Sequence, residues 1–364
     1  MPPLRILRKL ALHPPTHYDI CCTVRRLATA ALLIAGLQRP SAADPITPDA
    51  HHDPIATPTP WIDQGTSPVL VNDVPDVPVD TPRETHKLAA GLTLGGVYVG
   101  FITWAYFAWY RKHNELRGFK WGGDGWLGTN TYAGGADKFG HAWATMSLAR
   151  VGTEMLHQWG GFSKTTSTIV SSALSELLFL GVEVKDGYFY EFSFSDATGD
   201  TLGALAAVAL SLSPRLDELF DFRVEYWPSA AYRRQLDGGN LNVAEDYSGE
   251  TYLLALHLGA IHALSDHKWG AWTRFVDVAA GFGTRGYKPD PPSRMLPDYE
   301  HHQNIYFGVS LNAQGLFDWM LDGRSTAARK ITHGIFEVFN APFTFVPLLE
   351  DSRTPSGTIA PGGA

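Results

Sequence analysis

Three short polar signatures lie within sequence that otherwise has the pattern of apolar helices: DKFGH at residues 137–141, EVKD at residues 183–186 and FSFSDATGDTLGA at residues 192–204. Carboxylates and histidine are costly to bury unless they pair, cap a helix or hold a cation. The signatures therefore indicate one candidate site, and the apolar stretches around them indicate the helices that carry it.

Four apolar segments have the periodicity of packed helices: residues 88–110, 138–159, 165–184 and 196–212. The first carries no charged residue and is long enough to span a bilayer. Aromatic residues gather at its end, as they do at a membrane interface. Four glycines form a small face suited to close helix contact: Gly91, Gly95, Gly96 and Gly100. A buried core helix of a soluble domain is the alternative interpretation.

Further along the chain, the apolar pattern changes from helical to alternating. Residues 252–258, 276–282 and 305–311 alternate aliphatic side chains with small or polar ones, and residues 222–226 form a candidate fourth strand. We expect a small antiparallel sheet whose aliphatic face packs against the helices, with a membrane or another subunit as the alternatives. A short amphipathic helix is expected at residues 330–339.

The sequence thus predicts an α+β protein with an N-terminal helical bundle of about four apolar helices, embedded in a membrane or soluble, followed by a small antiparallel β-sheet region. The expected parts are a signal peptide or signal anchor at 1–43, a Pro/Asp-rich linker at 44–87, the helical bundle with the polar motifs at 88–215, the strand region at 216–349 and a disordered tail at 350–364.

The N-terminal segment has the pattern of an export signal. Arg25 and Arg26 precede an apolar run at residues 27–37, and small residues suited to signal peptidase follow at 41–43. An uncleaved signal anchor is the alternative. Both cysteines of the chain precede this run, so we expect a mature chain without a thiolate metal ligand, a disulfide or a lipid-modified cysteine.

The spacing within the signatures places polar side chains in pairs. Asp137 and His141 are four residues apart, as are Asp196 and Asp200, and a helix directs each such pair to one side. Glu183 and Asp186, three apart, form the third pair. Three pairs from three helices would build an oxygen and imidazole cage for a divalent cation, or an acid and base pair with separated pKa values. The candidate metal ligands are Asp137, His141, Glu183, Asp186 and Asp196.

A purely structural interpretation of the same residues remains open. Asp137 follows two glycines, as an N-cap does, and Asp196 with Ser193 fits a capping box. Glu183 and Asp186 would then end their helix before Gly187. In this interpretation the polar groups cap helices and lock the bundle.

Several other functions are disfavoured. The net charge of −8 argues against a nucleic acid partner. A GxGxxG pattern at Gly281, Gly283 and Gly286 is followed by prolines, which forbid the helix that a nucleotide site needs. No GxSxG, phosphate-loop or HExxH motif occurs. Three histidines recur every five residues at 257, 262 and 267, a spacing that scatters them, so we expect no shared metal there.

The order of the polar motifs resembles the YfiM-like family of predicted periplasmic lipoproteins of unknown function, and a similar order occurs in VanZ-like membrane proteins. The resemblance covers residues 88–204 and extends more weakly beyond them. The positions on the family pattern are Asp137, Lys138, His141, Glu183, Asp186, Ser195 and Asp196. Asp200 stands where an asparagine is usual, and the lipid-bearing cysteine is missing. The resemblance implies residence in the cell envelope and no particular reaction.

These observations predict an uncharacterised bacterial cell-envelope protein, exported to the periplasm and membrane-associated, with a structural or binding role. The expected partner is membrane lipid or another envelope component, and we expect neither nucleic acid nor nucleotide. The alternative is a metal-assisted hydrolase or transferase that acts on a lipid or an envelope glycan, with a divalent metal as cofactor.

Overall fold

The computed structural model describes residues 86–111, 117–123, 125–236, 242–288 and 301–355. The predicted export signal at 1–43 and almost all of the predicted linker lie outside these residues. All of the described residues belong to one compact unit within Pro68–Ala364.

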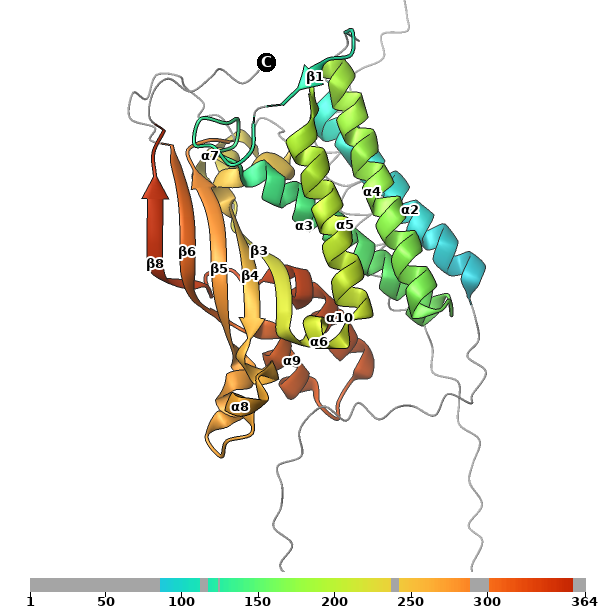
Figure 1. The fold of residues 1–364 in the computed structure, drawn as a ribbon. Helices are drawn as coiled ribbons and strands as arrows, with labels where there is room; N and C mark the ends of the chain where they lie inside the picture. Colours follow the sequence, from blue (N-terminus) through green and yellow to red (C-terminus); the bar gives the residue numbers. More distant parts are fainter. Residues whose placement is uncertain (1–85, 112–116, 124, 237–241, 289–300, 356–364) are drawn as a thin grey trace, which may run out of the picture. The chain divides into compact units, whose positions relative to one another are not determined.

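Four long helices occupy the predicted helical segments (Figure 1). They are α2 (Lys87–Ala105), which continues as a π-helical turn over Tyr106–Tyr110, α3 (Ala136–Glu154), which continues likewise over Met155–Trp159, α4 (Lys164–Phe189) and α5 (Phe194–Leu212). The prediction of an α+β fold with helices before the sheet is therefore confirmed.

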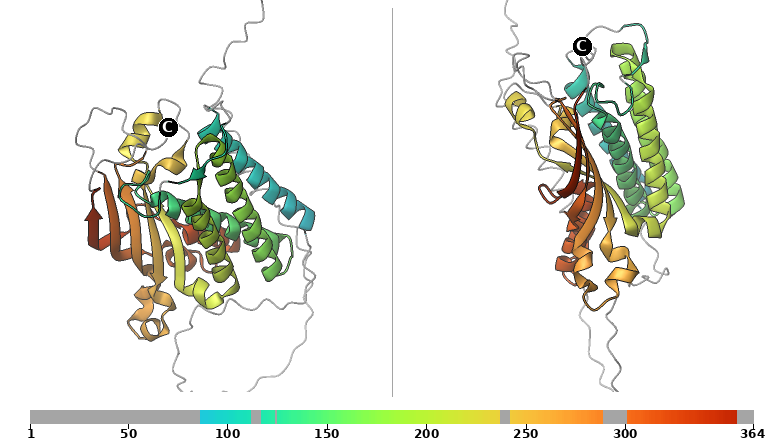
Figure 2. Two further views of the ribbon diagram at one scale, coloured as in Figure 1. Left: turned by 45° about the horizontal axis from the view of Figure 1, so that its top comes forward. Right: turned by 60° about the vertical axis from the view of Figure 1, so that its left-hand side comes forward.

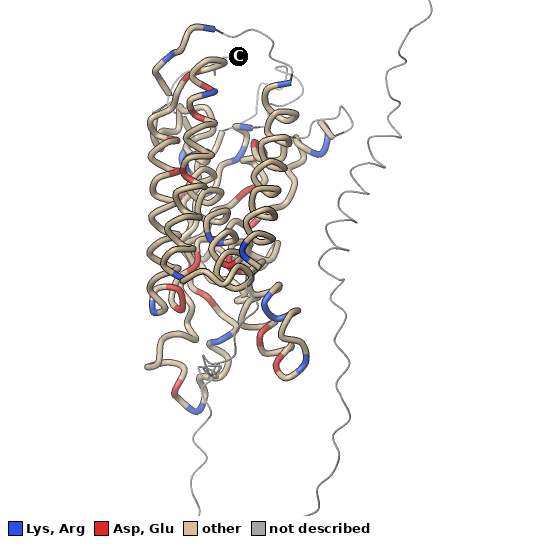
Figure 3. Tube along the Cα trace, turned by 90° about the vertical axis from the view of Figure 1, so that its right-hand side faces the viewer, with Lys and Arg blue, Asp and Glu red and all other residues tan. Residues whose placement is uncertain are grey.

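Only two segments of the described chain are long and apolar enough to cross a membrane, Lys87–Tyr110 and Lys164–Phe189. The expected number of about four such helices is not supported, and embedding in a membrane stays a prediction. The first segment is 17% buried and the second 39%. α2 carries no charged residue after Lys87, whereas α4 carries Lys164, Glu176, Glu183, Lys185 and Asp186. Figure 3 shows the charged residues along the chain.

Small residues allow α3, α4 and α5 to pack closely. Buried serines of α4 face α3, and Ser175 donates a hydrogen bond to the Thr145 carbonyl at 2.8 Å. The glycine face expected on α2 makes no such contact. A Cβ at Gly91, Gly95, Gly96 or Gly100 would meet nothing within 4 Å, so this part of the prediction is wrong.

The sheet has six strands in the order β7-β3-β4-β5-β6-β8. Their bounds are β3 (Phe220–Tyr226), β4 (Glu250–His257), β5 (Val276–Arg285), β6 (His302–Leu311), β7 (Phe339–Asn340) and β8 (Val346–Arg353). All neighbours are antiparallel except β3 and β7. The predicted tail at 350–364 starts too early, because β8 pairs with β6 through Arg353. Outside this sheet, β1 (Trp121–Gly122) pairs with β2 (Phe192–Ser193).

The helices cover part of one face of the sheet (Figure 2). Val224, Tyr252 and Phe282 form a buried cluster with Ala133 and Ala136 at the start of α3. On the same face of the sheet, in the neighbouring row of paired residues, the side chains of Leu254, Phe307 and Leu349 are exposed. The expectation that the helices cover the aliphatic face is therefore only partly correct.

Shorter helices complete the described chain. They are α6 (Pro214–Leu219), α7 (Ala230–Leu236), α8 (His262–Ser265), α9 (Ala313–Leu321) and α10 (Thr326–Val338), with short 3-10 segments between strands. The expected helix at 330–339 corresponds to α10, which begins earlier because Ser325 caps it. Val338 at its end packs against Met146 and Ala149 of α3.

Candidate metal centre

The three polar signatures meet between α3, α4 and α5. Two glycines explain how α5 approaches α3 so closely: a Cβ at Gly199 would lie 2.8 Å from the Lys138 carbonyl oxygen, and one at Gly203 would overlap the Ala142 carbonyl. This approach places Asp196 and Asp200 beside Lys138 and His141.

His141 is oriented by Asp200. Its Nδ1 lies 3.0 Å from Asp200 Oδ1, and the same oxygen accepts a hydrogen bond from the Thr145 hydroxyl at 3.0 Å. The other ring nitrogen, Nε2, lies 3.7 Å from Glu183 Oε1, which is beyond hydrogen-bond distance. In the neutral ring, a proton held on Nδ1 by Asp200 would leave an Nε2 lone pair directed toward Glu183, so a cation that binds here would displace the Nε2 proton.

His141, Glu183 and Asp196 form a group whose potential ligand atoms all lie within 4.8 Å of one another. Each residue comes from a different helix. Glu183 is 2% exposed, whereas the side chains of His141 and Asp196 are 20% and 14% exposed. The group therefore has one deeply buried carboxylate and two partly accessible donors.

Lys138 lies beside this group. Its Nζ is 2.6 Å from Asp137 Oδ2 and 3.0 Å from Asp196 Oδ1, with all three side chains largely buried. Asp137 thus pairs with the lysine and does not belong to the three-residue group. It is also not the N-cap, since α3 begins at Ala136 after Gly135.

The remaining predicted residues surround the group. Ser193 caps α5 by accepting a hydrogen bond from the Asp196 N–H, which confirms one half of the predicted capping box. The other half is not formed, because the Ser193 N–H donates to Glu183 Oε2 at 3.1 Å. Ser195 donates to the Gly125 carbonyl. Asp186 accepts a hydrogen bond from the Tyr110 hydroxyl at 2.7 Å. Glu183 and Asp186 do not end their helix, because α4 runs to Phe189.

The protonation of the cluster follows from burial and charge. Burial alone would lower the pKa of His141, but the neighbouring carboxylates, Asp200 first, raise it to about 10. Burial raises the pKa of Glu183 to about 8, against the opposing effect of the His141 charge. Burial also raises the pKa of Asp186 to about 6, although the Tyr110 hydrogen bond acts against it.

Negative charge is in excess in this cluster. Lys138 and His141 are the cationic side chains, and the carboxylates around them are those of Asp137, Glu183, Asp186, Asp196 and Asp200. Asp200 is 1% exposed, and its Oδ2 has no hydrogen-bond partner among the described residues. Such a set is costly in a protein interior unless protons or a cation neutralise it.

The sequence did not indicate a second buried cluster, which lies on the sheet. Arg223 pairs with Asp221 and with Asp277 Oδ2 at 2.7 Å. His257 lies between the same two aspartates. The two aspartates balance the charges of Arg223 and protonated His257, so this cluster stabilises the sheet and has no excess charge for a ligand to neutralise. In the sequence, the alternation of charged residues in DFRVEY (residues 221–226) could have indicated charged side chains on one face of a strand. His262 and His267 lie elsewhere, as expected of scattered histidines.

Residues 123–212 match the model of a family described as "Predicted periplasmic lipoprotein (DUF2279)". This stretch is similar to an uncharacterised family of periplasmic proteins. It includes α3, α4 and α5 and therefore every residue of the candidate site. The similarity supports export and residence in the envelope, while the YfiM-like and VanZ-like resemblances are not confirmed. No curated protein and no solved structure matches the chain.

Proposed function

We propose that this exported envelope protein binds a divalent cation between α3, α4 and α5, with His141, Glu183 and Asp196 as ligands. The observation that carries the proposal is the convergence of their three donor atoms, from three helices, within 4.8 Å. In this role the cation joins the helices and fits a binding or structural function of the protein.

The surrounding groups support the same conclusion. A metal-bound histidine commonly donates its other ring N–H to a carboxylate, and Asp200 lies 3.0 Å from His141 Nδ1 in the position of that acceptor. A cation would also neutralise the excess of carboxylates. One imidazole with two carboxylates favours Zn²⁺, Mn²⁺ or Fe²⁺ over Ca²⁺, which prefers oxygen ligands alone.

A metal-assisted hydrolase or transferase that acts on a lipid or an envelope glycan is the second candidate. One observation favours it: burial raises the pKa of Glu183 to about 8, which suits a general base or acid that acts on a metal-bound water, a role that Glu183 would take in place of binding the ion. This reaction requires the bound cation, so a protein that binds no metal would contradict both candidates, and the metal measurement below tests them together.

We also propose that membrane lipid contacts the exposed face of α2. This helix and its continuation have the length of a bilayer span, and large apolar side chains along them are more than half exposed, including Leu92 and Val99. A sheet-borne contact with another envelope component is the competing explanation. Flotation with lipid vesicles measures the lipid contact directly.

The test of the cation site is the metal content of the purified protein, measured by elemental mass spectrometry after incubation with Zn²⁺ or Mn²⁺ and gel filtration. We expect about one ion per chain in the wild type and a loss of at least ten-fold in Glu183→Gln/Asp196→Asn, which removes two ligand charges at nearly constant volume. Asp200→Asn should retain the ion with a weaker affinity, by roughly ten- to a hundred-fold.

The matched control is Glu154→Gln/Asp266→Asn, which makes the same two changes at exposed positions outside the cluster. It should bind metal as the wild type does. A wild type that holds neither ion would contradict the proposal and would leave the polar cluster as a structural network. Circular dichroism of each variant separates loss of the ligands from loss of the fold.

A further inference from the structure

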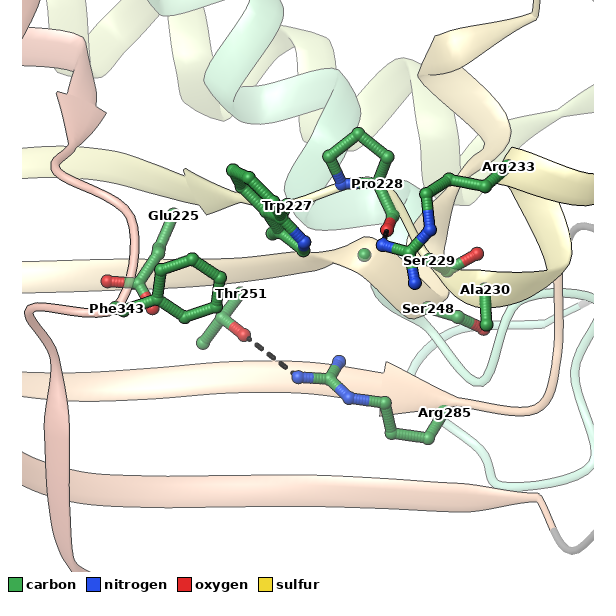
Figure 4. Close-up of a pocket in the computed structure, with 11 residues that line it drawn as sticks. Glu225, Trp227, Pro228, Ser229, Ala230, Arg233, Ser248, Thr251, Arg285 and Phe343 are labelled. Atoms are coloured by element: carbon green, nitrogen blue, oxygen red, sulfur yellow. Dashed lines mark hydrogen bonds between the residues drawn. The ribbon is translucent and has the colours of Figure 1, made fainter. Parts of the chain in front are cut away.

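A second site lies at the end of the sheet, apart from the polar cluster of the helices. A cavity of about 340 Å³ is bounded by the end of β3, the start of α7, β5 and the segment that leads to β8 (Figure 4). The side chains that give it chemical character are Glu225, Trp227, Arg233, Ser248, Arg285 and Phe343.

Two guanidinium groups on this cavity, those of Arg233 and Arg285, make no ion pair within 4 Å among the described residues, although the charge of Arg285 acts on the nearby Asp246 carboxylate. Arg285 donates to the Thr284 carbonyl at 2.7 Å and to the Thr251 hydroxyl at 3.5 Å. Arg233 donates to the Pro228 carbonyl at 2.6 Å. A guanidinium has five N–H donors, so both side chains keep donors for a ligand, and their planar fork suits phosphate and carboxylate oxygens.

Aromatic rings form another wall. The rings of Trp227 and Phe343 pack with centroids 4.9 Å apart, and the two side chains are 52% and 71% exposed. Phe343 has a φ of 63°, in the left-handed region that a bulky residue rarely adopts. Strained conformations of this kind concentrate at ligand-binding sites. The strain here holds an apolar ring in solvent at the mouth of a cavity.

Glu225 gives the two ends of the cavity different chemistry. Its Oε2 accepts hydrogen bonds from Asn340 Nδ2 at 2.7 Å and from the Phe345 N–H at 3.1 Å, which fixes the segment that carries Phe343. In Figure 4 this carboxylate lies near Phe343, while Arg233 and Arg285 lie toward the other end. The end at Glu225 can therefore accept hydrogen bonds from hydroxyl groups, and the end at Arg233 and Arg285 attracts an anion.

We propose that this cavity binds an anionic saccharide, a sugar ring that carries a phosphate or a carboxylate. Arg233 and Arg285 would bind the acidic group, and Glu225 would accept hydrogen bonds from ring hydroxyls. The C–H groups of the sugar would lie against the electron-rich faces of Trp227 and Phe343. The arginines, the carboxylate and the aromatic rings thus recognise three different parts of one ligand. None of these residues belongs to the cation site.

Isothermal titration calorimetry of the full-length protein tests this assignment with four probes: glucose 1-phosphate, glucuronate, glucose and inorganic phosphate. We expect one of the two acidic sugars to bind at least ten-fold more tightly than glucose and than phosphate, and the pair distinguishes a phosphate-bearing from a carboxylate-bearing ligand. Arg285→Gln should weaken that binding by ten-fold or more. Trp227→Ala should reduce the affinity for the acidic sugar to that of inorganic phosphate, since the contact with the sugar ring is lost.

Arg234→Gln is the matched control, because this neighbour of Arg233 is exposed and does not line the cavity. It should bind the acidic sugar as the wild type does. The proposal is overturned if neither acidic sugar binds the wild type, or if inorganic phosphate binds as tightly as either of them. Equal affinities of Arg285→Gln and Arg234→Gln, with both variants folded by circular dichroism, would overturn it as well.

Discussion

Two histidines, one half-buried and one buried, show how neighbouring residues decide what a titratable side chain can do. His141 uses one ring nitrogen on Asp200 and directs the other toward Glu183 across 3.7 Å. His257 uses both, with Nδ1 2.8 Å from Asp277 Oδ1 and Nε2 3.0 Å from Asp221 Oδ2. The Nε2 of His141 becomes a ligand position when it loses its proton, whereas both ring nitrogens of His257 lie within hydrogen-bond distance of aspartates.

His257 makes stability depend on pH. Burial would lower the pKa of His257, but its hydrogen bonds to Asp221 and Asp277 outweigh this and raise the pKa to about 9. The folded state therefore keeps a proton that the unfolded chain releases near pH 6.5. This contribution is fully present below pH 6.5 and is lost as the pH rises through 9, a decrease on the order of 3 kcal/mol in the free energy of unfolding.

Urea unfolding at pH 6, 7.5 and 9 measures this decrease. The folded pKa values of His141, Glu183 and Glu250 are also raised, so the wild-type curve contains their titration too, and the informative quantity is the difference between wild type and His257→Gln. We expect a shallower loss of stability in the variant. His262→Gln, at an exposed position of α8, should keep the wild-type slope. An identical slope in His257→Gln would show that this ring does not carry the proton.

At the scale of elements, α5 reaches α3 only because glycines face the contact. A Cβ on Gly203 would overlap the Ala142 carbonyl, and backbone on both sides prevents easy relief. We expect Gly203→Ala to lower the free energy of unfolding by about 1–3 kcal/mol, as overpacking does. Chemical denaturation measures the change.

Gly181 provides the matched control for this substitution. It lies inside α4, where an added Cβ meets nothing within 4 Å. Gly181→Ala should raise stability by roughly 0.5–1 kcal/mol, because alanine is the better helix former. If Gly203→Ala were as stable as Gly181→Ala, the close approach of α5 and α3 would not be a requirement of the fold.

The elements differ in how far sequence could predict them. Apolar periodicity located the four long helices, and alternation located β3, β4, β5 and β6, since each carries its own pattern. The edge strands β7 and β8 were missed. β7 has two residues, and β8 contains Pro347 and is exposed throughout, so neither has the half-buried pattern of a strand.

At the scale of the whole molecule, sequence could place polar pairs on helix faces but not decide which faces meet. The three-residue group excludes Asp137 and Asp186. Asp137 pairs with its sequence neighbour Lys138, and tertiary packing brings the Tyr110 hydroxyl to Asp186. The sequence could not predict the cluster around Arg223 and His257 either, because it depends on which strands pair. Asp221 and Asp277 reach His257 only through the register of β3, β4 and β5, which a single strand's pattern does not specify.

The proposed lipid contact is also a property of the whole molecule, because exposed apolar side chains occur on both α2 and β8. We expect the chain from residue 44 onward to float with vesicles of phosphatidylethanolamine and phosphatidylglycerol in a density gradient. Leu92→Glu/Val99→Glu should abolish flotation, since each charge would be costly in hydrocarbon. Both side chains are exposed, at 68% and 64%, so the fold should survive the change.

Leu348→Glu/Leu349→Glu separates the two apolar surfaces. These side chains on β8 are 63% and 68% exposed, nearly the same as those on α2, so the variant adds the same charge to an equally apolar place on the sheet. Continued flotation of this variant alone would assign the lipid contact to α2. If only the α2 variant Leu92→Glu/Val99→Glu still floated, the lipid contact would belong to the sheet, and α2 would then be the surface for another envelope component.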